Sequence, residues 1–162
     1  NIHFLIGELF PMTFANRLAG AQFALQRAGA KISKGGNVLY AEADDLKSLK
    51  RYLKRQKSCP DAFICSNDAI AAVFRQTLEA AGLDVPQDVM LTGFADLQIA
   101  SLMSPKLTTV HQNREMMAHM AFKRLMDRIN DPSLPPCDFF LPSNLVARES
   151  TLSSKNFKRR KS

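Results

Sequence analysis

The chain has 162 residues, 46% apolar and 23% charged, which is the composition of a folded domain able to bury one core. It has no apolar run of the ~18–20 residues that a membrane-spanning helix needs, so we expect no membrane association. The net charge is +7, but five basic residues fall within the last eight positions, KNFKRRKS. Without those five charges the remaining chain carries +2, which argues against a nucleic-acid-binding face. We expect residues 153–162 to form a basic, disordered tail.

Residue types that often carry catalysis or bind metals are scattered along the chain. The three histidines lack metal-ligand spacing, and there is neither a Gly-rich phosphate loop nor a GxSxG nucleophile elbow. The cysteines are odd in number, and Cys65 lies within an apolar run, which is typical of a reduced thiol in a cytoplasmic protein. We therefore expect no enzymatic activity, no metal and no cofactor.

Short apolar runs alternate with amphipathic stretches along the first 92 residues. The apolar runs predict buried strands at residues 2–6, 38–41, 62–65 and 89–92. Three helices are predicted between them: one capped by Thr13 and ended by Gly29, one opened by the acidic pair at 44–45, and one at 69–81. Alternation at this spacing predicts an α/β fold with a parallel sheet and right-handed crossovers.

The rest of the chain has a different pattern. Residues 93–105 are predicted to be irregular or briefly helical, 107–112 extended, 113–130 a long helix, and 139–145 and 146–149 extended again. The long helix carries apolar side chains on more than one face, at Met116, Met117, Met120, Ala121, Phe122, Leu125, Met126 and Ile129. A stripe of that width needs burial on two sides, which indicates partner structure that this chain lacks. A Met-rich, adaptable binding surface is the alternative interpretation.

Polar residues directly follow three of the predicted strands, in the segments 8–13, 66–68 and 94–96. Open parallel sheets bind small molecules at the carboxyl ends of their strands, so these segments and Arg17 form the candidate ligand site. Arg17 and Asn67 offer the donors and the acceptor that a hydroxylated ligand needs. Two structural interpretations stay open: Asn67 or Asp68 caps the following helix, and Arg17 pairs with an acid. His111, beside the next crossover, is a further candidate contact.

Six segments of the sequence occur in a characteristic order and spacing. They are NRLAG at 16–20, PDAFICSNDAIA at 60–71, GLDVPQDVMLTGFADLQIA at 82–100, PKLTTVHQ at 105–112, EMM at 115–117 and LPSNLVARESTL at 141–152. In this combination the chain resembles the LacI/GalR (lactose-repressor-like) family from about Ile2 to Leu152. The resemblance implies a Rossmann-like lobe of a two-lobed, type I periplasmic-binding-protein-like core in a cytoplasmic transcriptional regulator.

The resemblance also implies how the chain is organised. Residues 1–152 would form the C-terminal part of the effector-binding core, its second lobe, and residues 113–145 would return to a first lobe. Most of that first lobe and an N-terminal helix-turn-helix would lie outside this chain. A homodimer would then bind DNA only through the missing headpiece. A periplasmic sugar-binding protein of a transport system shares the fold and is the alternative interpretation.

By the family pattern, Arg17, Asn67 and the first acid after a Gly-Phe pair hold the effector, which is a sugar, a nucleoside or a related metabolite. The first two positions match, but the third holds Ala95, followed by Asp96. Loss of that acceptor would weaken sugar binding by on the order of 1–3 kcal/mol, which favours a less hydroxylated or anionic effector unless Asp96 substitutes. The full set of expected contact residues is Phe10, Thr13, Arg17, Asn67, Asp68, Phe94, Ala95 and Asp96.

Overall fold

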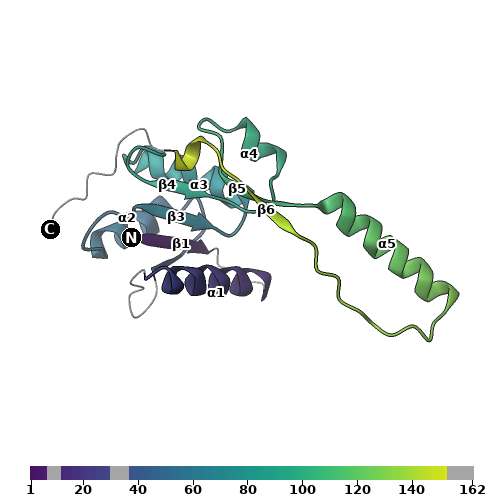
Figure 1. Cartoon of the computed structure of the whole chain (residues 1–162). Helices are drawn as coiled ribbons and strands as arrows, with labels where there is room; N and C mark the ends of the chain where they lie inside the picture. The colour runs from purple at the N-terminus through teal and green to yellow at the C-terminus, as the bar shows by residue number, and fades with distance from the viewer. Residues whose placement is uncertain (7–11, 30–36, 153–162) are drawn as a thin grey trace.

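The computed structural model describes residues 1–6, 12–29 and 37–152, and its main body is a four-stranded parallel sheet (Figure 1). The strands are β1 (Ile2–Ile6), β2 (Val38–Tyr40), β3 (Ala62–Cys65) and β4 (Met90–Thr92), arranged in the order β2-β1-β3-β4. Helices α1 (Met12–Arg27), α2 (Leu46–Arg55) and α3 (Asp68–Ala80) connect these strands in sequence. The predicted α/β class with a parallel sheet is confirmed.

Different helices cover the two faces of the sheet. Leu5 and Phe63 belong to the main core cluster, where they pack with Phe74 and the other buried residues of α2 and α3. Because side chains alternate along a strand, Phe4 and Ile6 lie on the opposite face, which α1 covers (Figure 1). Four apolar or hydroxyl side chains of α3 are buried, whereas α1 has no buried residue. The core of the lobe therefore lies on the α2 and α3 side, and α1 packs loosely on the other.

The helix ends follow the local signals in the sequence, with one exception. Asp45 caps α2 and Asn67 caps α3, each through a side-chain oxygen that accepts a backbone N–H of the first turn. Gly29 takes a positive φ of 73° just after α1, the conformation that glycine allows at a helix end. The prediction that Thr13 caps α1 is wrong, because α1 begins at Met12 and Thr13 lies exposed in its first turn.

After β4 the chain leaves the sheet and returns to it. It runs through α4 (Gln98–Leu102), β5 (Thr109–Gln112), α5 (Arg114–Asn130), β6 (Ser143–Val146) and a 3₁₀ helix, η1 (Glu149–Thr151). β5 and β6 pair antiparallel, so the outgoing and returning chains lie side by side. The Ser150 hydroxyl donates to the Leu91 carbonyl at 2.7 Å and accepts from the Thr108 N–H at 2.8 Å, which fastens η1 to β4 and to the start of the crossover.

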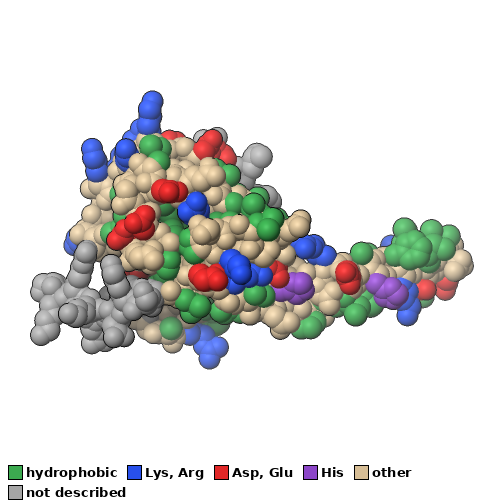
Figure 2. Space-filling view, turned by 90° about the horizontal axis from the view of Figure 1, so that it is seen from above, with side chains coloured by type: hydrophobic (Ala, Val, Ile, Leu, Met, Phe, Trp, Pro, Cys, Tyr) green, Lys and Arg blue, Asp and Glu red, His purple; other side chains and the backbone are tan. Residues whose placement is uncertain are grey.

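Helix α5 stands away from the body on the two crossover strands (Figure 1). None of its residues is buried, and hydrophobic side chains cover much of its surface (Figure 2). The large exposed ones are Met116, Met117, Phe122, Leu125, Met126 and Ile129. Although α5 is the longest helix in the described part of the chain, no helix there is long and apolar enough to cross a membrane.

The returning strand is shorter than the sequence suggested. Extended structure was expected over 139–145 and 146–149, but β6 covers only Ser143–Val146, and η1 begins at Glu149. Two physical reasons account for the difference. Pro142 has no N–H to donate to a ladder, and β5 offers register partners for only four residues.

Candidate functional site

The strand order creates a topological switch point between β1 and β3. β2 and β3 lie on opposite sides of β1, so the connections after β1 and β3 run to opposite faces and leave a crevice at the carboxyl edge. α1 follows β1 and α3 follows β3, which brings Arg17 and residues 66–68 to this edge. Arg17 and residues 66–68 therefore lie where open sheets of this type bind ligands, while residues 8–11 of the first segment fall outside the described residues.

Arg17 is the cation at this edge, and its guanidinium is held in place. Nη1 donates to the carbonyl oxygen of Ser66 at 2.7 Å. The guanidinium carbon lies 3.8 Å from the ring centroid of Phe94 and 5.4 Å from that of Phe14. Partial burial lowers the pKa of Arg17 from its ordinary value, yet an arginine stays protonated under physiological conditions. The sequence left an acid partner for Arg17 open; the partners described here are a carbonyl and two rings.

The turn after β3 places one amide and one hydroxyl beside Arg17. The side-chain oxygen of Asn67 accepts the Ile70 N–H at 2.8 Å, so Asn67 is the cap of α3, and its amide NH₂ can still donate to a ligand. Ser66 is buried, and its hydroxyl has no hydrogen-bond partner among the described residues. A buried hydroxyl without a partner costs free energy, which makes it a natural ligand contact.

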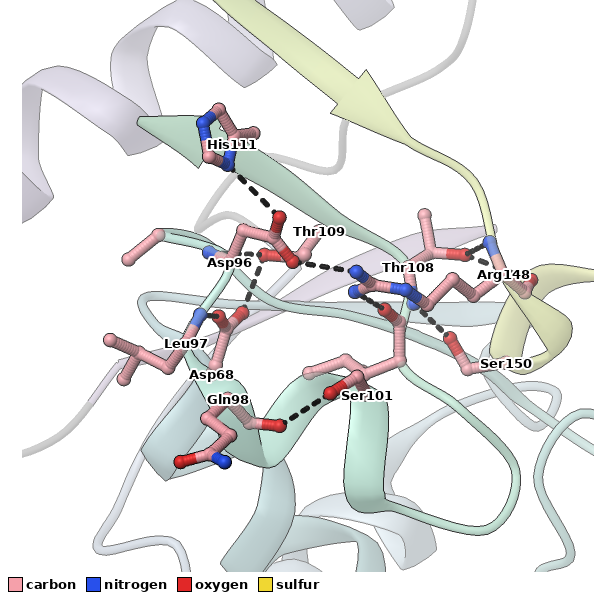
Figure 3. A network of polar contacts seen from close by, with 12 residues as sticks. Asp68, Asp96, Leu97, Gln98, Ser101, Thr108, Thr109, His111, Arg148 and Ser150 are labelled. Carbon is pink, nitrogen blue, oxygen red and sulfur yellow. Dashed lines mark hydrogen bonds and ion pairs between the residues drawn. The ribbon is translucent and has the colours of Figure 1, made fainter. Parts of the chain in front are cut away.

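Asp68 supports the site from within the protein. It is fully buried, and one carboxylate oxygen accepts the Thr109 hydroxyl at 2.5 Å while the other accepts the Leu97 N–H at 2.7 Å (Figure 3). Its own N–H donates to the carbonyl of Phe94 at 3.2 Å. The expectation that Asp68 contacts an effector directly does not fit this burial. Asp68 instead ties the turn after β3 to the loop after β4 and to β5.

Asp96 is the centre of a second network, which joins the loop after β4 to both crossover strands (Figure 3). Oδ1 accepts Arg148 Nη2 at 2.7 Å, and Oδ2 lies 3.0 Å from His111 Nδ1. Arg148 also donates from Nη1 to the Leu107 carbonyl at 2.9 Å. Burial opposes ionisation of Asp96, but the hydrogen bonds from Arg148 and His111 outweigh it and lower the pKa of the carboxyl. The carboxylate is therefore already satisfied by protein groups.

The backbone of this loop is strained at two consecutive residues. Ala95 has a φ of 111° and Asp96 a φ of 53°, conformations that residues with a Cβ rarely adopt. Such a residue costs of order 1–3 kcal/mol and persists only where its surroundings fix it. Here the Ala95 N–H donates to the Val110 carbonyl at 2.9 Å, and Arg114 reaches the carbonyls of both strained residues at 3.4 Å.

A small cavity opens beside Arg17, between α1 and the sheet. Most of its lining is apolar, and Arg17 and Ser66 provide the polar groups. The lining residues are Phe4, Leu5, Ile6, Phe14, Arg17, Leu18, Ile64, Cys65 and Ser66. Loose packing of α1 thus leaves space next to the one partly buried guanidinium of this edge.

The predicted contact residues fall into three groups. Arg17, Asn67 and Phe94 meet at the switch point, with Ala95 next in the chain; Asp68 and Asp96 lie behind them with internal partners. Thr13 is exposed in the first turn of α1, and Phe10 lies outside the described residues. Sequence reasoning did not single out Arg148 or Thr109, because the carboxylates that they contact are 52 and 41 residues away.

The described residues give little support for a metal site or for a reactive cysteine. No group of three or more His, Cys, Asp and Glu side chains there is arranged to hold a metal ion. Cys65 is buried in β3, and burial raises the pKa of its thiol, so it serves as an apolar side chain as predicted. His111 contacts Asp96 but lacks a third ionisable partner that would make the pair a metal site.

Comparisons with known proteins agree with this geometry. The chain matches the family model of the periplasmic binding protein-like domain over residues 10–151. It is 36% identical over 139 residues to the ribose operon repressor of Escherichia coli (strain K12), a match that covers 83% of this chain and 41% of the repressor. It is 29% identical over 154 residues to the HTH-type transcriptional repressor PurR of Pasteurella multocida, covering 94% of this chain and 46% of PurR. The structure of the transcriptional regulator CelR in complex with cellobiose matches with a TM-score of 0.80 and 26% identity, over 92% of this chain and 46% of that one.

The fold and the switch-point site define a lobe of a periplasmic-binding-protein-like core. The chain belongs to the LacI/GalR family and corresponds to the effector-binding region of its transcriptional regulators. It spans less than half the length of the two curated relatives described above. The resemblance seen in the six sequence segments is thereby confirmed.

Proposed function

We propose that this chain is the second lobe of a DNA-binding transcriptional regulator and senses a small metabolite at the switch point between β1 and β3. The observation that carries the proposal is the Arg17 guanidinium, which is fixed on the Ser66 carbonyl and the Phe94 ring beside an open cavity. Arg17, Asn67 and Phe94 contact the ligand, while Asp68 and Asp96 hold the surrounding loops. The role is binding rather than catalysis.

The exposed surface of helix α5 supports the presence of a first lobe in the complete protein, against which α5 packs. Six large apolar side chains of α5 are exposed, and an exposed apolar surface of this kind normally marks an interface. In the proposal residues 113–145 pack in a first lobe, so the ligand lies between two lobes. A homodimer carries the DNA-binding headpieces, and the protein acts in the cytoplasm.

The loop after β4 offers a route from the ligand to the other lobe. Phe94 lies under Arg17, and the neighbouring Asp96 is joined to β5 through His111 and to the chain after β6 through Arg148. A ligand that moves Phe94 therefore acts on the two strands that lead to α5. Ligand-dependent reorientation of the lobes would appear as ligand-dependent affinity for the operator.

The relatives support a regulator rather than a transport receptor of the same fold. Two of them are repressors, of a ribose operon and PurR, and the structural neighbour is a regulator with bound cellobiose. A sugar or a related metabolite is therefore the first ligand class to test. The secretory alternative predicts a signal peptide instead of a DNA-binding motif upstream of Asn1.

The first test is the coding sequence upstream of Asn1. A helix-turn-helix within the first ~60 residues is the expected result, and a secretory signal peptide without such a motif would overturn the proposal. The second test titrates the full-length protein with D-ribose and cellobiose by calorimetry, with Arg17→Gln as the site variant and Arg75→Gln as the matched control. Arg75 lies on α3 in a pair with Glu79 and away from the cavity lining. Ligand binding that is equally strong in both variants would remove Arg17 from the site.

A further inference from the structure

Among the described residues, the carboxylates of Asp68 and Asp96 lie near the ligand edge, and both have protein partners. Asp68 accepts the Thr109 hydroxyl and the Leu97 N–H, and it is fully buried. Asp96 is paired with Arg148 and His111. Both carboxylates are therefore engaged by protein groups, and Arg17 has no contact with either of them in the described chain.

The contacts of Arg17 within the described chain are all uncharged. They are the Ser66 carbonyl at 2.7 Å and the rings of Phe94 and Phe14. Stacking on an aromatic face contributes on the order of 1 kcal/mol and leaves the guanidinium charge in place. Burial lowers the pKa of Arg17, but an arginine stays protonated under physiological conditions, so the positive charge is present at this edge.

Among the described residues, the groups that can face a ligand at this edge are mainly hydrogen-bond donors. Arg17 has only donors, and the oxygen of Asn67 already accepts one hydrogen bond in the α3 cap, while its NH₂ group can donate. The Ser66 hydroxyl is more than nine-tenths buried, lines the same cavity as Arg17 and has no partner among the described residues. Ala95, next to Phe94, contributes a methyl group and no acceptor. A neutral polyol needs acceptors for its hydroxyl protons, whereas an oxyanion accepts hydrogen bonds and donates none.

We infer that the effector of this lobe carries an oxyanion, a carboxylate or a phosphate ester, bound by Arg17 with the Ser66 hydroxyl and the Asn67 amide. This inference rests on the proposed function, because it names the ligand class of the same site. The guanidinium supplies two parallel N–H donors that match a carboxylate or phosphate edge. Mostly apolar cavity walls fit a ligand body with few hydroxyl groups.

The test measures binding of small probes to the full-length protein by calorimetry at constant ionic strength. The probes are inorganic phosphate and acetate, which separate the two oxyanion sources, and D-ribose and cellobiose as neutral polyols. We expect phosphate or acetate to bind, and Arg17→Gln to weaken that binding by about tenfold to a hundredfold, the usual range for a lost charge-assisted hydrogen bond. Arg75→Gln, which removes a partly exposed arginine of α3, should leave anion binding unchanged.

A gain-of-function variant gives the sharper result. Ala95→Asp adds a carboxylate to the loop beside Phe94, so it should weaken phosphate or acetate binding at least about tenfold by like-charge repulsion. The same variant should improve binding of ribose or cellobiose, because it supplies the missing acceptor. Asparagine at this position controls for side-chain size and backbone conformation.

The outcomes separate the two claims. If a neutral polyol binds in an Arg17-dependent manner and neither anion binds, the inference is wrong and the proposed function stands. Absence of any Arg17-dependent binding, of anion or polyol, would overturn both. Anion binding that Ala95→Asp leaves unchanged would show that the anion lies elsewhere, which also overturns the inference.

Discussion

The ion pair between Asp96 and Arg148 should be one of the strongest single side-chain interactions in the lobe. Replacing Arg148 with methionine keeps the apolar stem of the side chain and removes its charge and donors. The substitution leaves the Asp96 carboxylate, whose side chain is only 18% exposed, with His111 as its remaining side-chain partner. It also removes the donor to the Leu107 carbonyl.

The magnitude follows from these contacts. Arg148 makes hydrogen bonds of 2.7 Å to Asp96 and 2.9 Å to Leu107, and hydrogen bonds to charged groups contribute about 1.5–3 kcal/mol each. Residual solvent access at both side chains reduces that sum, and the strained loop at Ala95 and Asp96 loses a restraint. We expect Arg148→Met to lower the free energy of unfolding by about 2–4 kcal/mol.

Urea unfolding followed by circular dichroism measures this loss, with Arg75→Met as the control. The Arg75–Glu79 pair joins a partly exposed arginine to an exposed glutamate at i,i+4 spacing, so its removal should cost only about 0.3–0.5 kcal/mol. The folded-state pKa of Asp96 lies below its ordinary 3.8, so its stabilisation is present above that value and is lost as the pH falls through the folded pKa. The difference between wild type and Arg148→Met should therefore shrink below about pH 4. A loss no larger than that of the control at pH 7 would refute the reasoning.

Three further predictions concern the body of the lobe. Gly93→Ala should destabilise the protein by more than about 3 kcal/mol in urea unfolding, because a Cβ there would collide with the buried Asp68. Gly20→Ala is the contrasting substitution: the space around Gly20 is open, so the change should stabilise α1 by about 0.5–1 kcal/mol. His3 is buried and its pKa is lowered to about 4, so the unfolded chain binds more protons and stability should fall by about 2–3 kcal/mol between pH 6.5 and 4. The variant His3→Gln should remove most of that fall in stability, whereas His119→Gln, at an exposed position, should not. If the two variants lose stability equally between pH 6.5 and 4, the fall does not come from His3.

Local signals in the sequence predicted those parts of the fold that depend on local physics. The strands at 2–6 and 62–65 have the predicted bounds because each is a short, mainly apolar run, interrupted only by His3 in the first, and ended by a polar or glycine residue. Asn67 was one of two candidate caps, and the structure selects it because its side-chain oxygen reaches the Ile70 N–H. The start of α1 was missed, since a threonine at 13 is a good cap in isolation but the helix begins one residue earlier.

Contacts between distant residues were beyond the reach of sequence patterns. Asp68 and Asp96 each follow a residue expected to contact the ligand, so proximity in sequence assigned them the same role. The structure separates them, because the chain turns at both places and directs the carboxylates to partners on the crossover strands. The bounds of β6 likewise depend on its pairing with β5, more than thirty residues earlier in the chain. An isolated segment gives no signal for such pairing.

The loop 93–97 shows why a strained backbone is tolerated beside the ligand edge. The N–H groups of Gly93 and Ala95 donate to the Thr108 and Val110 carbonyls, and the Leu97 N–H donates to the Asp68 carboxylate, so the loop is tied both to the crossover segment and to the turn after β3. A relaxed loop could not make these contacts while also placing Phe94 against Arg17. The hydrogen bonds of the loop thus offset the backbone strain at Ala95 and tie the position of the loop to that of its neighbours. In the proposed mechanism, a ligand that displaces Phe94 also moves β5, which would pass the binding event to α5.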